Sequence, residues 1–249
     1  MAERQRIQGV LTDIDDTLTC DGHISPDALQ ALHQLKSAGY AVIAITGRPV
    51  GWSEPFATSW PVDAIVAENG AVALLGARKI YLQDAPTRQH NQTRMQAVMQ
   101  QVLQDVPNAR ASHDSAGRET DIAIDHSEFH HLEEAEIAQV VQCMQSAGMN
   151  ATVSSIHING WFGTHNKLEG ARWIVRALFQ RHLDDELDTW AYVGDSTNDQ
   201  LMFAHFANSV GVANIQRFVP ALQHLPRYIS PSERGTGFSE VAQAILASR

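Results

Sequence analysis

The fold is decided by the stretch Val10-Leu11-Thr12-Asp13-Ile14-Asp15-Asp16-Thr17, in which an apolar run ends in carboxylates. Alternate side chains of a β-strand point to the same side, so Asp13 and Asp15 can converge on one ligand and one divalent cation. Aspartates are also common in solvated turns that follow a strand. The stretch alone favours neither interpretation, and the rest of the chain has to decide.

The composition indicates a folded protein with a large core. The 249 residues, 44% of them hydrophobic, are enough for one large α/β domain or for a core with an inserted domain. A net charge of −10 disfavours nucleic acid as a partner. We expect no membrane partner and a cytoplasmic location, because no stretch has the apolar length of a membrane span and no signal-peptide core precedes the first apolar run. Cys20 and Cys143 predict neither a disulfide nor a zinc site.

Strand and helix patterns alternate in the two outer parts of the chain. Ser25 and Pro26 mark the start of a helix, and Gly39 its end. A hairpin is expected over 71–82, and a terminal helix from Phe238. The predicted parallel strands cover residues 10–13, 40–45, 64–67, 190–193 and 209–212. This order predicts an α/β fold with a doubly wound, Rossmann-like parallel-sheet core.

The middle of the chain has a different pattern, with amphipathic helices separated by short strands. Helices are expected over about 93–106 and 137–144, and strands at 121–125, 151–153 and 157–158. We therefore predict an inserted α+β cap domain at 83–160 and a core formed by 1–82 and 161–249. The expected hinges are 83–87 and 161–164. His126, His130 and His131 fall in a polar stretch of the insertion and are interpreted as surface residues, with a metal site as the alternative.

Further polar residues fall where the predicted strands end or helices begin, which is where open α/β sheets bind ligands. Thr46 follows the second strand, and Asp195, Asn198 and Asp199 follow the buried strand 190–193. Each has a simple structural alternative, because Thr46 could end a strand and Asp195 could cap a helix. Crowded carboxylates repel one another unless a cation is present, and their oxygens suit Mg²⁺.

Lys167 is harder to explain by structure alone. It stands in the first turn of a predicted helix, where the helix dipole opposes a cation. A nearby anion, either a carboxylate cluster or a bound phosphate, would account for it. Solvated lysines also tolerate this position, so the functional interpretation is favoured without being required.

Taken in order, these residues resemble the four motifs of the haloacid dehalogenase superfamily of phosphohydrolases. The motif residues are Asp13-x-Asp15-x-Thr17, Thr46-Gly47-Arg48, Lys167 and Gly194-Asp195-Ser196-x-Asn198-Asp199. The insertion after the second motif, and Glu68-Asn69-Gly70-Ala71 just before it, resemble the branch with a large α/β cap that includes sugar phosphatases and phosphomutases.

This resemblance implies a role for each motif residue. Asp13 would be the nucleophile that becomes an aspartyl-phosphate, and Asp15 the acid and base. Thr46 and Lys167 would hold the phosphoryl oxygens. The metal ligands would be Asp13, Asp195 and the backbone carbonyl of Asp15, with Mg²⁺ as cofactor. Asn198 and Asp199 would orient Lys167 and the metal waters.

The expected function is magnesium-dependent hydrolysis of a small-molecule phosphate ester, a sugar or polyol phosphate. A phosphomutase of the same branch and a catalytically silent binding module are the alternatives. The substrate itself and the oligomeric state are not predicted. Candidates for substrate binding are Arg48, Asn69, Arg118, His157 and Asn159, with Trp161 near the second hinge.

Overall fold

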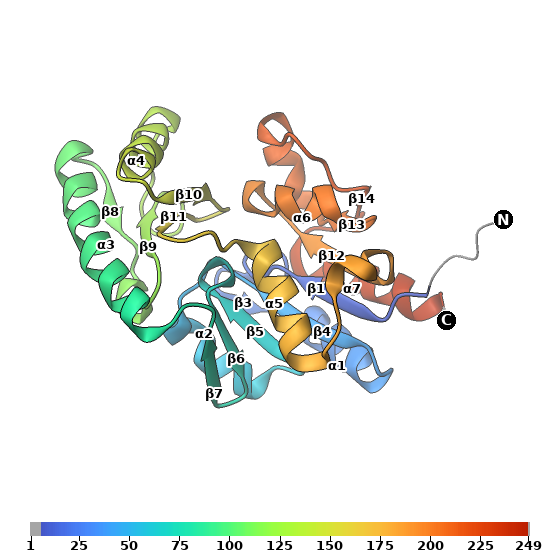
Figure 1. The fold of residues 1–249 in the computed structure, drawn as a ribbon. Helices are drawn as coiled ribbons and strands as arrows, with labels where there is room; N and C mark the ends of the chain where they lie inside the picture. Colours follow the sequence, from blue (N-terminus) through green and yellow to red (C-terminus); the bar gives the residue numbers. More distant parts are fainter. Residues whose placement is uncertain (1–5, 249) are drawn as a thin grey trace.

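An eight-stranded sheet forms the centre of the computed structural model, which describes residues 6–248 (Figure 1). Its strand order is β14-β13-β12-β1-β4-β5-β6-β7, parallel from β14 to β5, with β6 and β7 added antiparallel. The bounds are β1 Gly9–Thr12, β4 Ala41–Ile45, β5 Ala64–Ala67, β6 Val72–Leu75, β7 Arg78–Tyr81, β12 Trp190–Gly194, β13 Asn208–Gly211 and β14 Tyr228–Ile229. The doubly wound core and the hairpin predicted from the sequence are confirmed.

Helices cover both faces of this sheet because successive strand residues point to opposite sides. Val10 and Val42 pack under α1, α2 and α7, whereas Leu11 and Ile43 pack under α5 and α6. The helices are α1 Pro26–Ser37, α2 Val50–Ser59, α5 Lys167–Phe179, α6 Gln200–His205 and α7 Arg234–Ala247. The short hairpin β2 (Thr19–Cys20) and β3 (His23–Ile24) lies between β1 and α1 in the chain.

A separate antiparallel sheet with two helices forms a cap beside the core (Figure 1). Its order is β10-β11-β9-β8, and α3 and α4 pack on it around a hydrophobic cluster of their own that contains Met95, Ile124 and Val140. The bounds are α3 Ala85–Asp105, β8 Arg110–Ala111, β9 Ile122–Asp125, α4 Glu134–Ser146, β10 Asn150–Val153 and β11 His157–Trp161. The predicted α+β architecture of the inserted cap is thereby confirmed.

Short 3₁₀ helices connect many of these elements. They are η1 Glu68–Gly70, η2 Ser115–Gly117, η3 Leu183–Asp185, η4 Leu187–Thr189, η5 Thr197–Asp199 and η6 Ala213–Ala221. None of the helices within residues 6–248 combines the length and apolar character that crossing a bilayer requires.

Two predicted helix starts were wrong. Helix α3 begins at Ala85 instead of near residue 93, because Asp84 accepts a hydrogen bond from the Thr87 backbone nitrogen at 2.8 Å and Pro86 stands in the first turn. Residues 85–87, expected to be part of a hinge, are therefore helical. Helix α7 begins at Arg234, four residues before the predicted start.

Helix α2 was not predicted, and its internal Pro55 hides the helical pattern. Strand β11 runs to Trp161, which pairs with Asn150 in the cap sheet. The domain division at 82/83 and 160/161 stays a prediction.

His126 is not a surface residue as expected. It is buried, and its Nε2 lies 3.1 Å from the backbone oxygen of Ser154, because the segment after β9 runs alongside the turn between β10 and β11. Burial lowers the pKa of this imidazole.

Candidate active site

The predicted catalytic residues meet at the carboxyl edge of the central sheet. Asp13 follows β1, and Thr46 and Asp195 follow the two strands that flank β1 in the sheet, β4 and β12. The backbone nitrogen of Asp13 donates to the Val193 carbonyl at 2.8 Å, which fixes the start of the first loop. Parallel strands thus bring together side chains from distant parts of the sequence.

Lys167 joins the site from the first turn of α5. Its Nζ lies 2.6 Å from Asp13 Oδ1 and 2.6 Å from Asp199 Oδ1, and it donates to Asn198 Oδ1 at 3.3 Å. The Lys167 side chain is only 2% exposed. Two buried carboxylates therefore offset the unfavourable helix dipole at this position.

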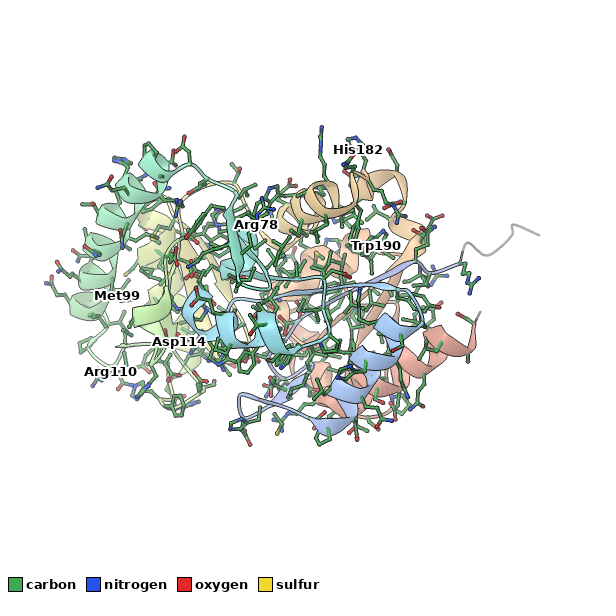
Figure 2. The ribbon with its side chains drawn as sticks, turned by 90° about the horizontal axis from the view of Figure 1, so that it is seen from below. Arg78, Met99, Arg110, Asp114, His182 and Trp190 are labelled. Carbon is green, nitrogen blue, oxygen red and sulfur yellow. The ribbon has the colours of Figure 1, made fainter. Side chains whose placement is uncertain are left out.

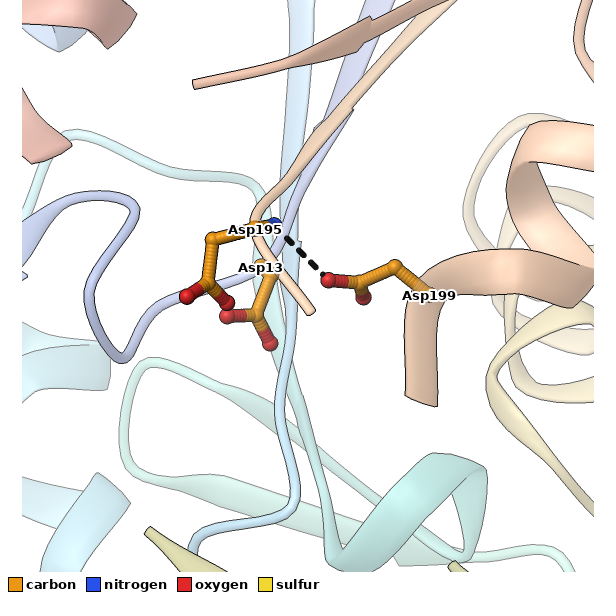
Figure 3. Close-up of side chains that lie close together, drawn as sticks. All are labelled: Asp13, Asp195 and Asp199. Carbon is orange, nitrogen blue, oxygen red and sulfur yellow. Dashed lines mark hydrogen bonds between the residues drawn. The ribbon is translucent and has the colours of Figure 1, made fainter. Parts of the chain in front are cut away.

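Asp199 holds this arrangement together. Its Oδ1 accepts hydrogen bonds from Lys167 and from the Tyr192 hydroxyl. Its Oδ2 accepts from the backbone nitrogens of Asp195 at 2.9 Å and Ser196 at 3.1 Å, the first of which is drawn in Figure 3. Because both oxygens already have two donors, Asp199 is suited to orient Lys167 and the 195–196 turn.

One carboxylate oxygen of Asp195 is unsatisfied in the described part of the chain. It is fully buried, and its Oδ2 accepts from Asn214 Nδ2 at 3.0 Å, whereas its Oδ1 has no hydrogen-bond partner within residues 6–248. A buried carboxylate oxygen without a donor is unfavourable unless a cation binds it. Carboxylate oxygens of Asp13, Asp195 and Asp199 lie within 4.8 Å of one another. Figure 3 shows the three side chains gathered at one point.

The core cluster, defined as Asp13, Lys167, Asp195 and Asp199, is short of positive charge. Burial, together with the charges of Asp199 and Asp15, raises the pKa of Asp13 to about 8 despite the neighbouring Lys167. Burial and the charges of Asp13 and Asp199 raise the pKa of Asp195 well above its usual value. Lys167 and the exposed Arg217, whose Nη2 lies 3.6 Å from Asp195 Oδ2, do not neutralise three buried carboxylates, so the donor set fits a hard divalent cation such as Mg²⁺.

Asp15 and Asp13 face the same small cavity. This cavity, of about 10 Å³, is also lined by Arg48 and closed from the cap side by the turn between β10 and β11, residues 154–157. The Asp15 carboxylate accepts from Arg48 Nε at 2.9 and 3.1 Å, and burial raises its pKa. The buried Thr46 hydroxyl accepts from the Arg48 backbone nitrogen at 2.9 Å.

A second group of charged residues joins the core to the cap, and we call it the interface network: Arg48, Asp114, Arg118, Glu128 and His157. Arg48 Nη1 lies 3.2 Å from Asp114 and its Nη2 lies 2.7 Å from Glu128. His157 Nε2 is 2.9 Å from the same glutamate, and Arg118 Nη2 is 3.0 Å from Asp114. Asp114 lies in the cap half next to α2, as Figure 2 shows.

The structure places some of the predicted substrate-binding residues at the small cavity and others away from it. Arg48, His157 and Asn159 line the small cavity, whereas Asn69 and Arg118 do not. Arg118 is buried against Asp121 at 2.8 Å and donates to the Gly47 carbonyl at 3.0 Å. A Cβ on Gly47 would lie 3.2 Å from Asn159 Oδ1 and 3.4 Å from Asn69 Nδ2, so a larger residue would crowd both amides.

Sequence reasoning missed two residues of the site, Asp114 and Glu128, and gave no role to a third, Glu68, which it quoted only as part of a motif. Asp114 and Glu128 contact Arg48 across 66 and 80 residues, and no local pattern marks them. Glu68, buried with a φ of 50°, accepts from the backbone nitrogens of Val50 at 3.0 Å and Thr120 at 2.5 Å, which fastens the cap to the core. Trp161, in contrast, has a structural role, since its Nε1 donates to the His165 carbonyl at 2.9 Å.

A larger cavity of about 550 Å³ lies beside the small one and shares Asp15, Arg48 and residues 155–156 with it. Its other walls combine polar groups with the rings of Phe129 and Phe218. This larger cavity, next to Asp15, has room for a small organic molecule.

Comparison with known proteins agrees with this geometry. The family model described as haloacid dehalogenase-like hydrolase matches residues 10–106, which include Asp13, Asp15 and Thr46. Among solved structures, sucrose-phosphatase from Synechocystis, crystallised with sucrose and phosphate, has a TM-score of 0.69 at 15% identity, with 97% of this chain and 98% of that chain covered.

Two further structures have the same fold. A Thermoplasma acidophilum protein has a TM-score of 0.75 at 15% identity and covers 97% of this chain and 99% of its own. A sugar phosphatase of haloacid dehalogenase subclass IIB has a TM-score of 0.66 at 16% identity, with 97% and 98% covered. At these identities the similarity shows the fold.

Proposed function

We propose that the chain, whose residues 10–106 match the family model described as haloacid dehalogenase-like hydrolase, is a magnesium-dependent phosphatase acting on a small phosphomonoester, a sugar or polyol phosphate. The observation that carries the proposal is the pair Asp13 and Asp15 facing one cavity, with Lys167 at 2.6 Å from the first carboxylate. This arrangement supplies a nucleophile, an acid and a fixed positive charge within one buried site.

The proposed reaction has two steps. A carboxylate oxygen of Asp13 attacks phosphorus while the bond to the leaving oxygen breaks, and Asp15 gives that oxygen a proton. Water then attacks phosphorus while the bond to the Asp13 oxygen breaks, Asp15 takes a proton from the water, and inorganic phosphate leaves. Lys167 and Thr46 hold phosphoryl oxygens during both displacements.

The cation has its ligands in the same site. Asp13, the unpartnered oxygen of Asp195 and the backbone carbonyl of Asp15 would hold Mg²⁺, which offsets the charge of the phosphoryl oxygens when bound. Asp199 and Asn198 would keep Lys167 and the 195–196 turn in place through the contacts described above.

A sugar or polyol leaving group is supported by the larger cavity. It adjoins Asp15 and presents carboxylates and guanidinium groups that can bind hydroxyls, together with the rings of Phe129 and Phe218. The structural relatives whose names state an activity include sucrose-phosphatase and a subclass IIB sugar phosphatase. A phosphomutase would use the same core residues but return the phosphoryl group to a second hydroxyl.

The test is a phosphate-release screen over phosphorylated metabolites and 4-nitrophenyl phosphate, with Mg²⁺ or with a chelator. We expect Mg²⁺-dependent release of inorganic phosphate, and no release by a folded Asp13→Asn variant. Isomer formation without free phosphate would support the phosphomutase instead. Inactivity over the whole panel would leave the silent binding module as the better account.

A further inference from the structure

We propose that Asp114 and Glu128, two carboxylates of the cap, are positioning residues that aim the acid Asp15 through Arg48. The inference rests on the proposed function, in which Asp15 protonates the leaving oxygen. It adds a consequence: the acid is aligned when the cap is closed over the site.

Arg48 is held on three sides. Its Nε donates to Asp15 at 2.9 Å, its Nη1 lies 3.2 Å from Asp114 and its Nη2 lies 2.7 Å from Glu128. The guanidinium is planar, with its donors in a rigid fork, so fixing two corners fixes the direction of the third. The side chain is only 4% exposed, and its guanidinium carbon lies 4.9 Å from the Trp52 ring centroid.

The two cap carboxylates are themselves held in place. Asp114 accepts from the Ser112 hydroxyl at 2.7 Å and pairs with Arg118. Glu128 pairs with His157, and its backbone nitrogen donates to Asp125 Oδ1 at 2.9 Å. The side chains of Asp114 and Glu128 are therefore fixed within the cap, so the position of the cap determines the orientation of Arg48.

Asp15 depends on this arrangement. Within residues 6–248, Arg48 is the sole hydrogen-bond partner of its carboxylate. If the cap lifts, Arg48 loses two of its three carboxylates, and no hydrogen bond from another residue of 6–248 fixes the orientation of the Asp15 carboxylate.

The size of the small cavity is the reason to expect such lifting. A volume of about 10 Å³ next to Asp13 and Asp15 holds roughly one water molecule, so a phosphoryl group enters only after the turn at 154–157 moves away. Closure then restores the contacts of Asp114 and Glu128 with Arg48. The acid is thus aligned after the substrate is enclosed.

The proposal predicts a dependence on the leaving group. An alkoxide needs a proton from Asp15, whereas 4-nitrophenolate leaves without one. We compare kcat/KM for 4-nitrophenyl phosphate with kcat/KM for the alkyl phosphate that the wild-type enzyme cleaves best. Glu128→Ala and Asp114→Ala should each lower the alkyl value by about 10- to 100-fold and the aryl value by less than about threefold. Glu128→Gln, which keeps one acceptor oxygen for Arg48, should recover part of the loss.

The matched control is Glu119→Ala. Glu119 also joins the cap region to the core, through Lys79 Nζ at 2.7 Å and the Tyr81 hydroxyl at 2.7 Å, but it does not contact Arg48. This variant should change both esters by the same small factor. In an Asp15→Asn background, Glu128→Ala should cause no further loss, because both changes remove one function.

An equal loss on both esters, or no loss on either, for folded Glu128→Ala would overturn the inference. So would a full additional loss in the Asp15→Asn background. A wild-type enzyme that cleaves neither ester would instead contradict the proposed function, so the two failures are distinguishable.

Discussion

The core cluster is buried and the carboxylates of the interface network are partly buried, but the pKa values of the two sets of carboxylates are shifted in opposite directions. Burial and carboxylate neighbours raise the pKa of Asp13 to about 8. In the interface network, Arg118 and His157 outweigh burial and hold the pKa of Asp114 at about 2, and hydrogen bonds from His157 and Arg48 lower the pKa of Glu128.

The difference lies in the supply of positive charge. Each interface carboxylate has a cationic or imidazole partner from the chain itself, so the network can hold the cap without help. The core cluster has one buried cation, Lys167, for three carboxylates. The exposed Arg217 lies 3.6 Å from Asp195 Oδ2, and Asp195 Oδ1 has no hydrogen-bond partner within residues 6–248. A region that completes its own charge pairing is suited to structure, and one that does not is suited to bind a cation and react.

The largest effect should come from removing the one cation of the core cluster. Lys167→Met leaves Asp13 and Asp199 buried without their partner, and we expect a loss of about 3–5 kcal/mol in the free energy of unfolding without metal. Denaturant unfolding measures it. Lys36→Met is the control, because Lys36 pairs with Asp63 at a site where both side chains are partly exposed, and its loss should not exceed about 1 kcal/mol. Equal losses would remove the distinction between the regions.

Magnesium should stabilise the core cluster and leave the interface network unaffected. At a concentration a hundredfold above its Kd, Mg²⁺ should add about 2.7 kcal/mol, which raises Tm by roughly 5–10 °C for a chain of this size. Differential scanning calorimetry with Mg²⁺ or a chelator checks this. Asp195→Asn should abolish the rise, whereas Asp114→Asn, in the interface network, should keep it. If Asp114→Asn abolished the rise in Tm and Asp195→Asn kept it, the cation would bind in the interface network and not in the core cluster.

A smaller effect concerns His165, in the segment that leads from the cap to the core. Its ring stacks on Trp161, neither ring nitrogen has a hydrogen-bond partner within residues 6–248, and burial lowers its pKa from 6.5 to about 4. Below pH 6.5 His165 is protonated in the unfolded chain but stays neutral in the native chain. The free energy of unfolding should therefore fall as the pH drops from 6.5 towards 4. The loss should reach about 2 kcal/mol at pH 5.

Urea unfolding at pH 7 and pH 5 measures this loss. His165→Phe should reduce this loss, because phenylalanine has no group that takes up a proton on unfolding. His205→Gln, at the exposed end of α6, should leave the loss unchanged. A loss that persists in His165→Phe would assign the acid sensitivity to other groups.

The same two regions differ in how far the sequence predicts them. Asp13, Thr46 and Asp195 each follow a strand of one parallel sheet, and Lys167 begins a helix, so alternation of strand and helix was enough to bring them together. The core fold and the cap architecture followed from the same periodicity. Helix α2 was missed because Pro55 interrupts its pattern.

The interface network could not be found in this way. Its central contacts join Arg48 to Asp114 and Glu128 across the junction of two separately folded sheets. Which carboxylate reaches Arg48 depends on how the cap sits on the core, and no local spacing encodes that orientation. Glu68 was quoted as part of a motif, yet its bonds to the segment at 119–120 appear only in three dimensions.

The central claim is that Asp13 carries the phosphoryl group, and an Asp15→Asn variant tests it most directly. With 4-nitrophenyl phosphate the first step needs no proton from residue 15, while hydrolysis of the aspartyl-phosphate lacks its base. We predict a stoichiometric burst of nitrophenol and, after acid quench and peptide mass spectrometry, a phosphoryl group on Asp13. Steady turnover without a burst, or a phosphoryl group on another residue, would contradict the account.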